Sequence, residues 1–436
     1  MSKEKSVKKA VVKKEPPTSL KGMRDIIGDK YYQFQGFFEK AQEIAIYYGF
    51  KPIETPILEQ EEVFTASVGV GTDIVDKEMY SLKTKGGDHL AMRPEGTAGV
   101  MRAYIEHGMQ SEPQPVMLYY YGPFFRHDKP QRGRYRQLYQ FGLEIMGSDK
   151  SIIDALAIKT TVTILEEAGA TNLSVDINSI GDKECRGHYI KELTNYYKKH
   201  IANLPPIDRE RLKTNPLRIL DSKEAKTKEI NENAPEALSS LCHNCKKHFK
   251  ELLECLEEMG ITYNINKNLV RGLSYYTRTV FEIVEQGAGE DGEPLSIAAG
   301  GRYDYLARTL GSKKDVPGMG VGIGVDRVVE SSWYKKLSPR IIKKPKIYFI
   351  QLGIEAKLKS INVIEILRKA HVPIAQSLSK DSLGAQLAIA EKLGTPYTII
   401  FGQKEAIEET VIVRDMATRS QETVKQKNLL EYIKTL

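Results

Sequence analysis

The spacing of apolar residues predicts both helices and long strands in the first half of the chain. Between residues 31 and 48, aromatic and aliphatic side chains recur every three or four positions, which predicts a helix that ends at Gly49. Residues 116–146 have the pattern of a long antiparallel hairpin whose two strands are joined by a basic loop. A helix over 152–169 and a strand over 173–178 follow.

The middle of the chain changes in character. Residues 183–262 are charged and have helical periodicity broken by prolines, which predicts a helical insertion. Strand-like patterns return at 271–284 and 297–301, and again at 318–329, where the pattern runs on into a helix. The insertion therefore interrupts a larger domain, which we place at residues 18–336.

A second domain is predicted at the C-terminal end. The Pro- and Lys-rich stretch 337–346 is typical of a linker. After it, strand-like and helical patterns alternate, with strands near 347–352, 372–375, 397–401 and 410–414 and helices near 355–370, 382–393 and 425–435. This alternation predicts a small α/β domain over 347–436.

Composition and charge narrow the class of protein. A chain of 436 residues with 41% apolar and 28% charged residues is expected to form two or three soluble domains, with no apolar run long enough to cross a bilayer. Four cysteines in so long a chain fit a reducing cytoplasm rather than a disulfide framework. The net charge is +7, and the basic excess lies in residues 1–17, expected to be a disordered tail, and in 346–436. A polyanionic partner or a merely solvated tail explains that distribution equally well.

Glycine occupies every second position of one predicted strand, at Gly318, Gly320, Gly322 and Gly324. Side chains alternate between the faces of a strand, so one face is bare while the other carries apolar residues. Four such glycines cost about 2–4 kcal/mol relative to alanine, which a flat ligand such as a purine lying on the backbone would explain. Tight packing of a strand against a helix is the alternative. The usual Gly-rich phosphate loops are absent from the sequence.

Arginines accompany the predicted strands. Arg126 ends the first hairpin strand, Arg271 precedes a tyrosine pair on another predicted strand, and Arg327 follows the glycine-rich strand. A guanidinium group holds two phosphate oxygens at once, so three of them on sheet strands suggest a triphosphate clamp. Each arginine taken alone is better explained as a surface salt-bridge partner.

Carboxylates form a second group. Gln140 and Glu144 are four residues apart on one predicted strand and share a face, where we expect them to stand beside Arg126. Glu95 lies in the short Arg93–Thr97 segment. An ionised carboxylate only accepts hydrogen bonds, so it could bind an amino group or an imidazole N–H. A simple ion pair with an arginine is the alternative for Glu144.

The cysteines offer weak evidence for a metal. Cys242, Cys245 and Cys255, with His243 and His248 among them, could supply zinc ligands. Their spacing also repeats helically, and no second C-x-x-C follows. We therefore predict no metal site.

Five segments in order resemble one known family. Gly22–Ser67, Phe125–Glu144 and Gly318–Val328 resemble the three motifs of class II aminoacyl-tRNA synthetases, and Arg271–Thr277 and Ala299–Asp304 resemble two peptides particular to histidyl-tRNA synthetases of the bacterial type. The resemblance runs from Gly22 to the C-terminus. It implies an α+β fold with an antiparallel catalytic sheet flanked by helices, a helical insertion and a C-terminal α/β anticodon-binding domain.

The resemblance also implies roles for individual residues. Arg271 and Arg126 would be catalytic. ATP would be bound by Arg126, Asp128, Arg327, Gly320, Gly322 and Gly324. Histidine would be bound by Glu95, Gly96, Thr97, Arg126, Gln140, Glu144, Arg271, Tyr275 and Tyr276. The tRNA acceptor end would meet Gln131, Arg132 and Arg134. Mg²⁺ would accompany ATP, and the partners would be tRNA(His) and a second copy of the chain in a cytoplasmic homodimer.

Three positions depart from the family pattern, and two other functions remain to be weighed. Ser274 replaces a usual Asp, Asp128 a common Glu, and Leu138 an adenine-stacking Phe, whose loss costs about 1 kcal/mol. A non-catalytic paralogue that regulates ATP phosphoribosyltransferase typically lacks the catalytic arginine and the C-terminal domain, both of which are expected here. A different class II ligase is disfavoured by the peptides at 271–277 and 299–304.

Overall fold

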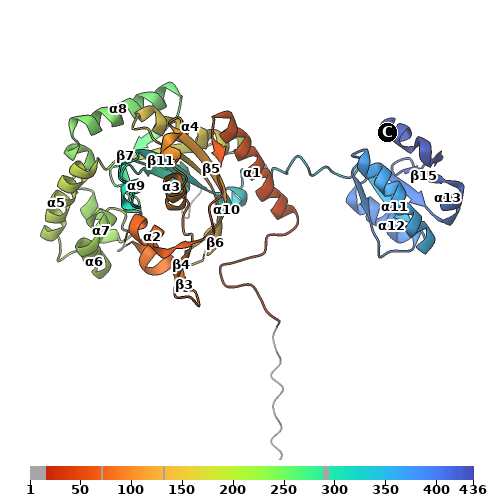
Figure 1. The fold of residues 1–436 in the computed structure, drawn as a ribbon, viewed down its shortest axis with the longest axis horizontal. Coiled ribbons are helices and arrows are strands. Elements are labelled where there is room, and N and C mark those ends of the chain that lie inside the picture. The colour runs from red at the N-terminus through yellow and green to blue at the C-terminus, as the bar shows by residue number, and fades with distance from the viewer. Residues whose placement is uncertain (1–15, 70–71, 131–132, 288–293) are drawn as a thin grey trace, which may run out of the picture. The chain divides into compact units, whose positions relative to one another are not determined.

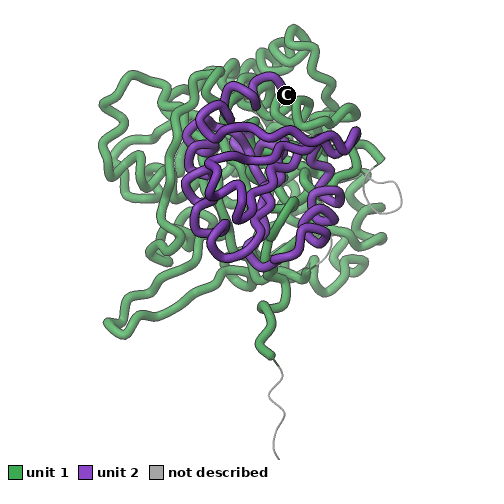
Figure 2. The backbone as a smooth tube through the Cα atoms, turned by 90° about the vertical axis from the view of Figure 1, so that its right-hand side faces the viewer, with its two compact units in different colours: residues 1–339 green, residues 340–436 purple. Residues whose placement is uncertain are grey.

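The chain folds into two compact units, residues 1–339 and 340–436 (Figures 1 and 2). The structure, a computed structural model, describes residues 16–69, 72–130, 133–287 and 294–436. Most of the tail predicted at 1–17 therefore lies outside the described residues. Each unit is described by itself below.

A large sheet organises the first unit. Within the described residues it has eight strands in the order β1-β5-β6-β11-β10-β9-β7-β8. The neighbours from β5 to β7 pair antiparallel, and β1 and β8 add parallel edges. The bounds are β1 Lys51–Pro52, β5 Val116–Phe125, β6 Gln137–Met146, β7 Leu173–Ser179, β8 Tyr263–Ile265, β9 Thr277–Glu285, β10 Leu295–Arg302 and β11 Gly318–Gly324. Together with the helices around it, this sheet confirms the predicted α+β class.

The two faces of this sheet differ because side chains alternate along each strand. On β6 and β11 the odd-numbered residues, such as Phe141, Leu143 and Val321, enter the main hydrophobic core. Helices α1 (Asp29–Tyr47) and α4 (Ser151–Ala168) cover that face (Figure 1). The even-numbered residues, among them Gln140 and the glycines of β11, lie on the opposite face. This second face carries the candidate site.

Smaller elements border the second face. A three-stranded sheet, β2 (Leu58–Gln60), β4 (His89–Met92) and β3 (Tyr80–Lys83), leads into α3 (Thr97–Glu106) within the described residues. The connecting elements are α2 Glu61–Val68, η1 Ile74–Glu78, η2 Met109–Ser111, α9 Leu306–Thr309 and α10 Val325–Glu330.

Helices occupy most of the stretch between β7 and β8. They are α5 Lys183–Lys199, α6 Pro206–Thr214, η3 Pro216–Ile219, α7 Ala225–Asn231, η4 Ala237–Ser240 and α8 His243–Glu258. The last of them, α8, returns to the main core through Phe249, Leu252 and Leu256. Both ends of this helical stretch therefore adjoin the large sheet (Figure 1).

The second unit has a mixed five-stranded sheet in the order β13-β12-β14-β15-β16. The first three strands run parallel and the last two antiparallel. Its elements are β12 Ile347–Gln351, α11 Ile354–Lys369, β13 Ile374–Gln376, α12 Leu383–Leu393, β14 Tyr397–Phe401, α13 Gln403–Glu408, β15 Thr410–Asp415, β16 Gln421–Lys425, η6 Gln426–Asn428 and α14 Leu429–Lys434. The short elements α13 and β16 are additions to the predicted alternation.

One predicted strand begins later than expected. The strand-like pattern starts at residue 271, but β9 begins only at Thr277, and Arg271, Tyr275 and Tyr276 lie in the loop before it. The apolar residues of this loop pack in a hydrophobic cluster, and they are not part of a hydrogen-bonded strand. None of the helices in the described part of the chain has the length and apolar character needed to cross a lipid bilayer.

Candidate active site

A cavity of about 550 Å³ opens on the polar face of the large sheet. Strands β6 and β11 and the start of β10 contribute to its lining, together with the segment before α3, the turn after β5 and the loop before β9. The residues predicted from sequence that border it are Glu95, Gly96, Thr97, Arg126, Asp128, Arg134, Gln140, Arg271, Tyr275, Tyr276, Gly322, Gly324 and Arg327. Segments far apart in sequence thus converge on one cavity. Gln131 and Arg132 lie outside the described residues.

Four arginines from separate segments border this cavity. Arg126 follows β5, Arg134 lies in the hairpin loop, Arg271 precedes β9 and Arg327 lies in α10. Burial holds the pKa of Arg327 below its ordinary value, and the positive charges of the other three arginines add to this effect. Guanidinium groups that disfavour one another's charge are stabilised by an anion between them. The cavity is therefore suited to a multiply charged anion such as a polyphosphate.

The arginine side chains have fixed partners. Arg126 donates from Nε to the carbonyl oxygen of Pro94 at 2.8 Å. Arg271 is paired with Glu282. Burial lowers the pKa of Arg271, but Glu282 together with Tyr276, Tyr275 and Asp221 raises it, so that the pKa lies above its ordinary value. Arg327 donates to the carbonyl oxygen of Ser296. These contacts fix the guanidinium groups in place before any ligand arrives.

The three predicted clamp arginines differ from the prediction in one respect. They were expected on sheet strands, but Arg126 lies just beyond β5, Arg271 in a loop and Arg327 in α10. All three side chains border the cavity, although none of these residues lies on a strand of the sheet. Their convergence therefore depends on how the turn after β5, the loop before β9 and helix α10 pack together.

Glu95 binds the N-terminus of α3. Its carboxylate accepts from the backbone N–H groups of Thr97 and Ala98 at 2.7 and 2.9 Å and from the Tyr275 hydroxyl at 3.1 Å. Burial raises the pKa of Glu95 in spite of these hydrogen bonds. The interaction orients both the start of α3 and Tyr275 toward the cavity, because each donor has one fixed acceptor.

Glu144 is fully buried behind the residues that border the cavity. Its carboxylate accepts hydrogen bonds from the hydroxyl of Thr97 at 2.7 Å and from that of Tyr303, and lies 3.5 Å from the hydroxyl of Tyr120. Burial raises its pKa to about 8, although these hydroxyl groups favour the ionised form. Glu144 contacts Thr97, which borders the cavity, but does not itself line the cavity.

The predicted position of Glu144 beside Arg126 is wrong. Glu144 pairs across the hairpin with Leu118, whereas the closing pair is Phe125 with Gln137. Eight residues of extended strand separate Leu118 from Arg126, about 27 Å at 3.4 Å per residue. The two side chains share a face of the sheet but act at different ends of the site.

The glycines of β11 divide into two pairs. Gly322 and Gly324 border the cavity, and a β-carbon at Gly322 would meet only Gln140, at an ordinary 3.7 Å. A β-carbon at Gly320 would lie 1.9 Å from a Glu144 oxygen, and one at Gly318 would lie 2.2 Å from the Tyr303 ring. Gly320 thus makes room for Glu144, and the structure does not support its predicted contact with a nucleotide.

Several residues of the site are absent from the predicted set. Tyr120 and Glu282 border the cavity, and Tyr303 holds Glu144. Glu282 is a charged residue within the apolar strand β9, and this signal alone could have marked it. The neighbouring Arg302 is buried and pairs with Asp154 and Asp304, so it joins β10 to α4.

Residues of the helical stretch complete the cavity wall. Arg211, Arg218, Asp221 and Lys223 border it, and Arg218 pairs with Asp73 on the far side. Burial raises the pKa of Asp221, and the negative charge of Glu282 adds to this effect. Leu138, the residue found where a stacking Phe is usual, also borders the cavity.

The chain is similar to known proteins along most of its length. The family model for histidyl-tRNA synthetase matches residues 22–328, and the model for an anticodon binding domain matches residues 346–436. The histidine–tRNA ligase of Dehalococcoides mccartyi strain CBDB1 is 39% identical over 416 residues, which cover 95% of this chain and 99% of that protein. That of Thermodesulfovibrio yellowstonii is 40% identical over 415 residues, which cover 95% and 97%.

Solved structures extend the likeness to the fold. The structure of apo histidyl-tRNA synthetase from S. aureus matches with a TM-score of 0.79 and 29% sequence identity, covering 96% of this chain and 99% of that one. The histidyl-tRNA synthetase model spans most of the first unit, and the relatives span both units. The chain belongs to the histidyl-tRNA synthetase family.

Proposed function

We propose that the protein is a histidine–tRNA ligase. It activates histidine with ATP to histidyl-adenylate and pyrophosphate, and then transfers histidine to the terminal ribose hydroxyl of tRNA(His). The observation that carries the proposal is the convergence of Arg126, Arg271 and Arg327 on one cavity, next to the buried Glu95–Thr97–Glu144 group. The relatives that match nearly the whole chain are named for this activity.

The first step brings two anions together. A carboxylate oxygen of histidine attacks the α-phosphorus of ATP, a new O–P bond forms, and the bond to the β-phosphate oxygen breaks, so that pyrophosphate leaves with the electron pair. Arg126 and Arg271 are assigned to the α-phosphate, where they offset the negative charge during the attack. Arg327 is assigned to the γ-phosphate. Catalysis consists mainly of orientation and fixed positive charge, since the groups are held before ATP binds.

The nucleotide lies over the glycine-lined part of the sheet. Gly322 and Gly324 leave the backbone of β11 open to a flat base, and Asp128 and Leu138 border the same cavity. Mg²⁺ is expected to accompany ATP and to neutralise part of the phosphate charge. The carboxylates of Glu78 and Glu282 at the cavity fit its preference for oxygen ligands.

Histidine selection depends on polar pairing. Glu95, Gly96, Thr97 and Gln140 are assigned to the α-amino end, and Glu144 with Tyr275 and Tyr276 to the imidazole. Glu144 is buried and accepts hydrogen bonds from the Thr97 and Tyr303 hydroxyl groups, so an imidazole N–H assigned to it would approach from the side of Thr97, which borders the cavity. A site of this kind discriminates against analogues that lack the hydrogen-bond donor far more strongly than an apolar pocket does.

The partners belong to the same proposal. Arg134, with Gln131 and Arg132 outside the described residues, is assigned to the tRNA acceptor end, and the second unit to the anticodon. A homodimer is supported by large apolar side chains that lie exposed between residues 20 and 58, among them Leu20, Ile27, Tyr31, Ile46, Tyr47, Ile57 and Leu58. The protein would act in the cytoplasm, where its tRNA is.

Pyrophosphate exchange tests the proposal directly. The purified chain is incubated with ATP and labelled pyrophosphate in the presence of each of the twenty amino acids in turn. Exchange with histidine alone is the expected result, followed by histidine transfer to tRNA(His). Exchange with another amino acid, or with none, would contradict the proposal.

A further inference from the structure

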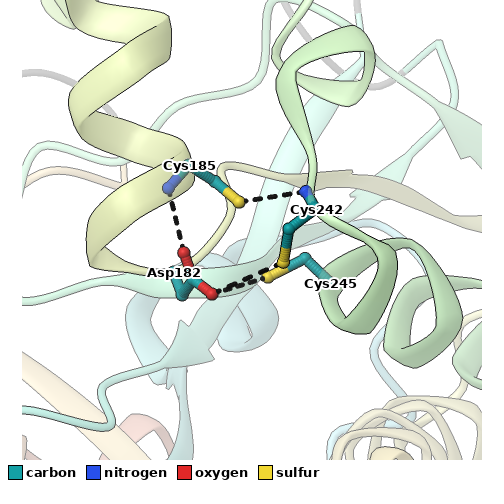
Figure 3. A group of neighbouring side chains, drawn as sticks. All are labelled: Asp182, Cys185, Cys242 and Cys245. Carbon is teal, nitrogen blue, oxygen red and sulfur yellow. Dashed lines mark hydrogen bonds between the residues drawn. The ribbon is translucent and has the colours of Figure 1, made fainter.

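Four side chains that the proposed reaction does not use meet where the helical stretch joins the sheet. They are Asp182, Cys185, Cys242 and Cys245, and one ligand atom of each lies within 4.8 Å of the others. Figure 3 shows the three sulfur atoms and the carboxylate turned toward one another from the starts of α5 and α8. The carboxylate oxygen of Asp182 is 3.3 Å from the sulfur of Cys245 and 3.7 Å from that of Cys242.

We propose that these four side chains form a structural zinc site. Cysteine thiolates and Asp carboxylates both bind Zn²⁺, and four such ligands complete the tetrahedral coordination of a structural site. A tetrahedral zinc with ligands at about 2.0–2.3 Å separates neighbouring ligand atoms by about 3.3–3.8 Å. The distances from the Asp182 oxygen to the sulfur atoms of Cys245 and Cys242, 3.3 and 3.7 Å, lie within this range.

The backbone around the cluster is arranged for negative charge. Asp182 is the N-cap of α5 and Cys185 lies three residues later, while Cys242 is the N-cap of α8 and Cys245 lies three residues later. Two helix N-termini thus point their partial positive charge at the same four ligand atoms. The backbone N–H of Cys242 also donates to the sulfur of Cys185 at 3.1 Å. Hydrogen bonds of this kind to sulfur stabilise metal-bound thiolates.

The cysteine-rich helix suggested a different ligand set from sequence. His248 is bound to Asp154 through Nε2 at 2.9 Å, and Cys255 packs on the main core, so neither belongs to the cluster. The missing partners, Asp182 and Cys185, precede Cys242 by nearly sixty residues. Cys242 and Cys245 are free thiols, and both sulfur atoms contact the carboxylate of Asp182.

The site would hold both ends of the helical stretch together and support the loop before β9. A zinc ion bound by both Asp182 and Cys245 would hold the two ends of the helical stretch together, which offsets part of the conformational entropy lost when that stretch is ordered. Arg186, next to Cys185, donates to the carbonyl oxygens of Ser274 and Tyr276 at 2.8 and 3.1 Å. Zinc would therefore act as a positioning element for Tyr275 and Tyr276 rather than as a reactant.

Metal content tests the site without reference to catalysis. The full chain is purified in reducing buffer through a tag that binds no metal, and its zinc is measured by mass spectrometry. About one zinc per chain is expected, and reconstitution with Co²⁺ should give thiolate-to-cobalt charge-transfer bands and the visible bands of a tetrahedral site. A reduced, folded chain that retains no zinc and gives no such spectrum would overturn the proposal.

Three variants locate the ligands. Cys242→Ser should lose zinc yet keep α8, because serine is a favoured N-cap residue. Asp182→Asn keeps an oxygen to cap α5 but removes the charge, and should weaken Zn²⁺ binding at least about tenfold, within the range for lost metal partners. Cys255→Ser is the matched control and should keep its zinc. Equal zinc content in Cys242→Ser and Cys255→Ser would overturn the site.

Discussion

The hydroxyl of Tyr303 donates a hydrogen bond to the carboxylate of Glu144, and both side chains are buried. Tyr303 follows the end of β10, whereas Glu144 lies on β6, and Gly320 of β11 between them has no side chain to separate them. The peptide 299–304 therefore contributes to the site by positioning a carboxylate. In the proposed function, where Glu144 is assigned to the imidazole of histidine, Tyr303 would act on histidine binding through Glu144.

Tyr303→Phe should shift the pH dependence of histidine use. The Tyr303 hydroxyl favours the ionised form of Glu144, so its removal should raise the pKa of Glu144 above about 8. The ionised carboxylate is the form that accepts an imidazole N–H, so the rise of kcat/KM for histidine with pH should move to higher pH. The pH profile of kcat/KM measures this. A profile that matches the wild type would show that Tyr303 does not act through Glu144.

Glu144→Gln should impair histidine binding more than ATP binding. Above a pH of about 8, where Glu144 is ionised, the amide keeps the size of the side chain but loses its charge, and a hydrogen bond to a charged group contributes about 1.5–3 kcal/mol. KM for histidine should rise roughly 10- to 100-fold on that basis, with KM for ATP nearly unchanged. Equal increases in both constants would indicate a purely structural role for Glu144.

The same substitution should change how stability depends on pH. The folded-state pKa of Glu144 is raised to about 8, so the folded state favours the protonated form. Its contribution to stability is full below the unfolded pKa of about 4.3 and is lost as the pH rises through about 8. The free energy of unfolding of Glu144→Gln, measured with urea, should therefore rise relative to that of the wild type between pH 5 and pH 9. The exposed Glu106→Gln is the control, and parallel curves for all three proteins would contradict the raised pKa.

Arg271→Ala should abolish histidine-dependent pyrophosphate exchange while the protein stays folded. Removing one preorganised group that stabilises transition-state charge costs about 10²–10³ in rate. Arg308→Ala is the matched control, because Arg308 is exposed and pairs only with Asp315 among the described residues. Near-normal exchange in Arg271→Ala would remove its catalytic role.

Two glycine substitutions on one strand should have separate effects. A methyl group at Gly322 meets only Gln140 at an ordinary distance, so Gly322→Ala should fold normally. It should raise KM for ATP, because the methyl group takes up space on the face of β11 assigned to the base. A methyl group at Gly320 would collide with the carboxylate of Glu144, so Gly320→Ala should lower the melting temperature and impair histidine binding. The reverse pattern would mean that the two glycines are assigned to the wrong functions.

Local sequence patterns were sufficient for the sheet and the glycine-rich strand. Alternation along 116–146 predicted a hairpin, and the structure has β5 and β6 paired along their full length. The odd-numbered residues of β11 enter the core as the period of two requires. These features depend only on neighbours in sequence.

Relationships between distant segments could not be obtained in this way. The depth of Glu144 depends on the hairpin register and on Tyr303, and the position of Arg271 depends on a loop that resembles a strand. The cluster of Asp182 and Cys185 with Cys242 and Cys245 depends on the packing of α5 against the start of α8. No spacing rule connects residues that only tertiary structure brings together.

A structure of the protein with ATP and histidinol tests the central claim most directly. Histidinol has the amine and imidazole of histidine but an alcohol in place of the carboxylate, so no adenylate forms. The account predicts the α-phosphate within about 3.2 Å of guanidinium nitrogens of Arg126 and Arg271, the γ-phosphate at Arg327, and the adenine over Gly322. Phosphates bound away from these arginines, or an imidazole bound away from Glu144, would contradict it.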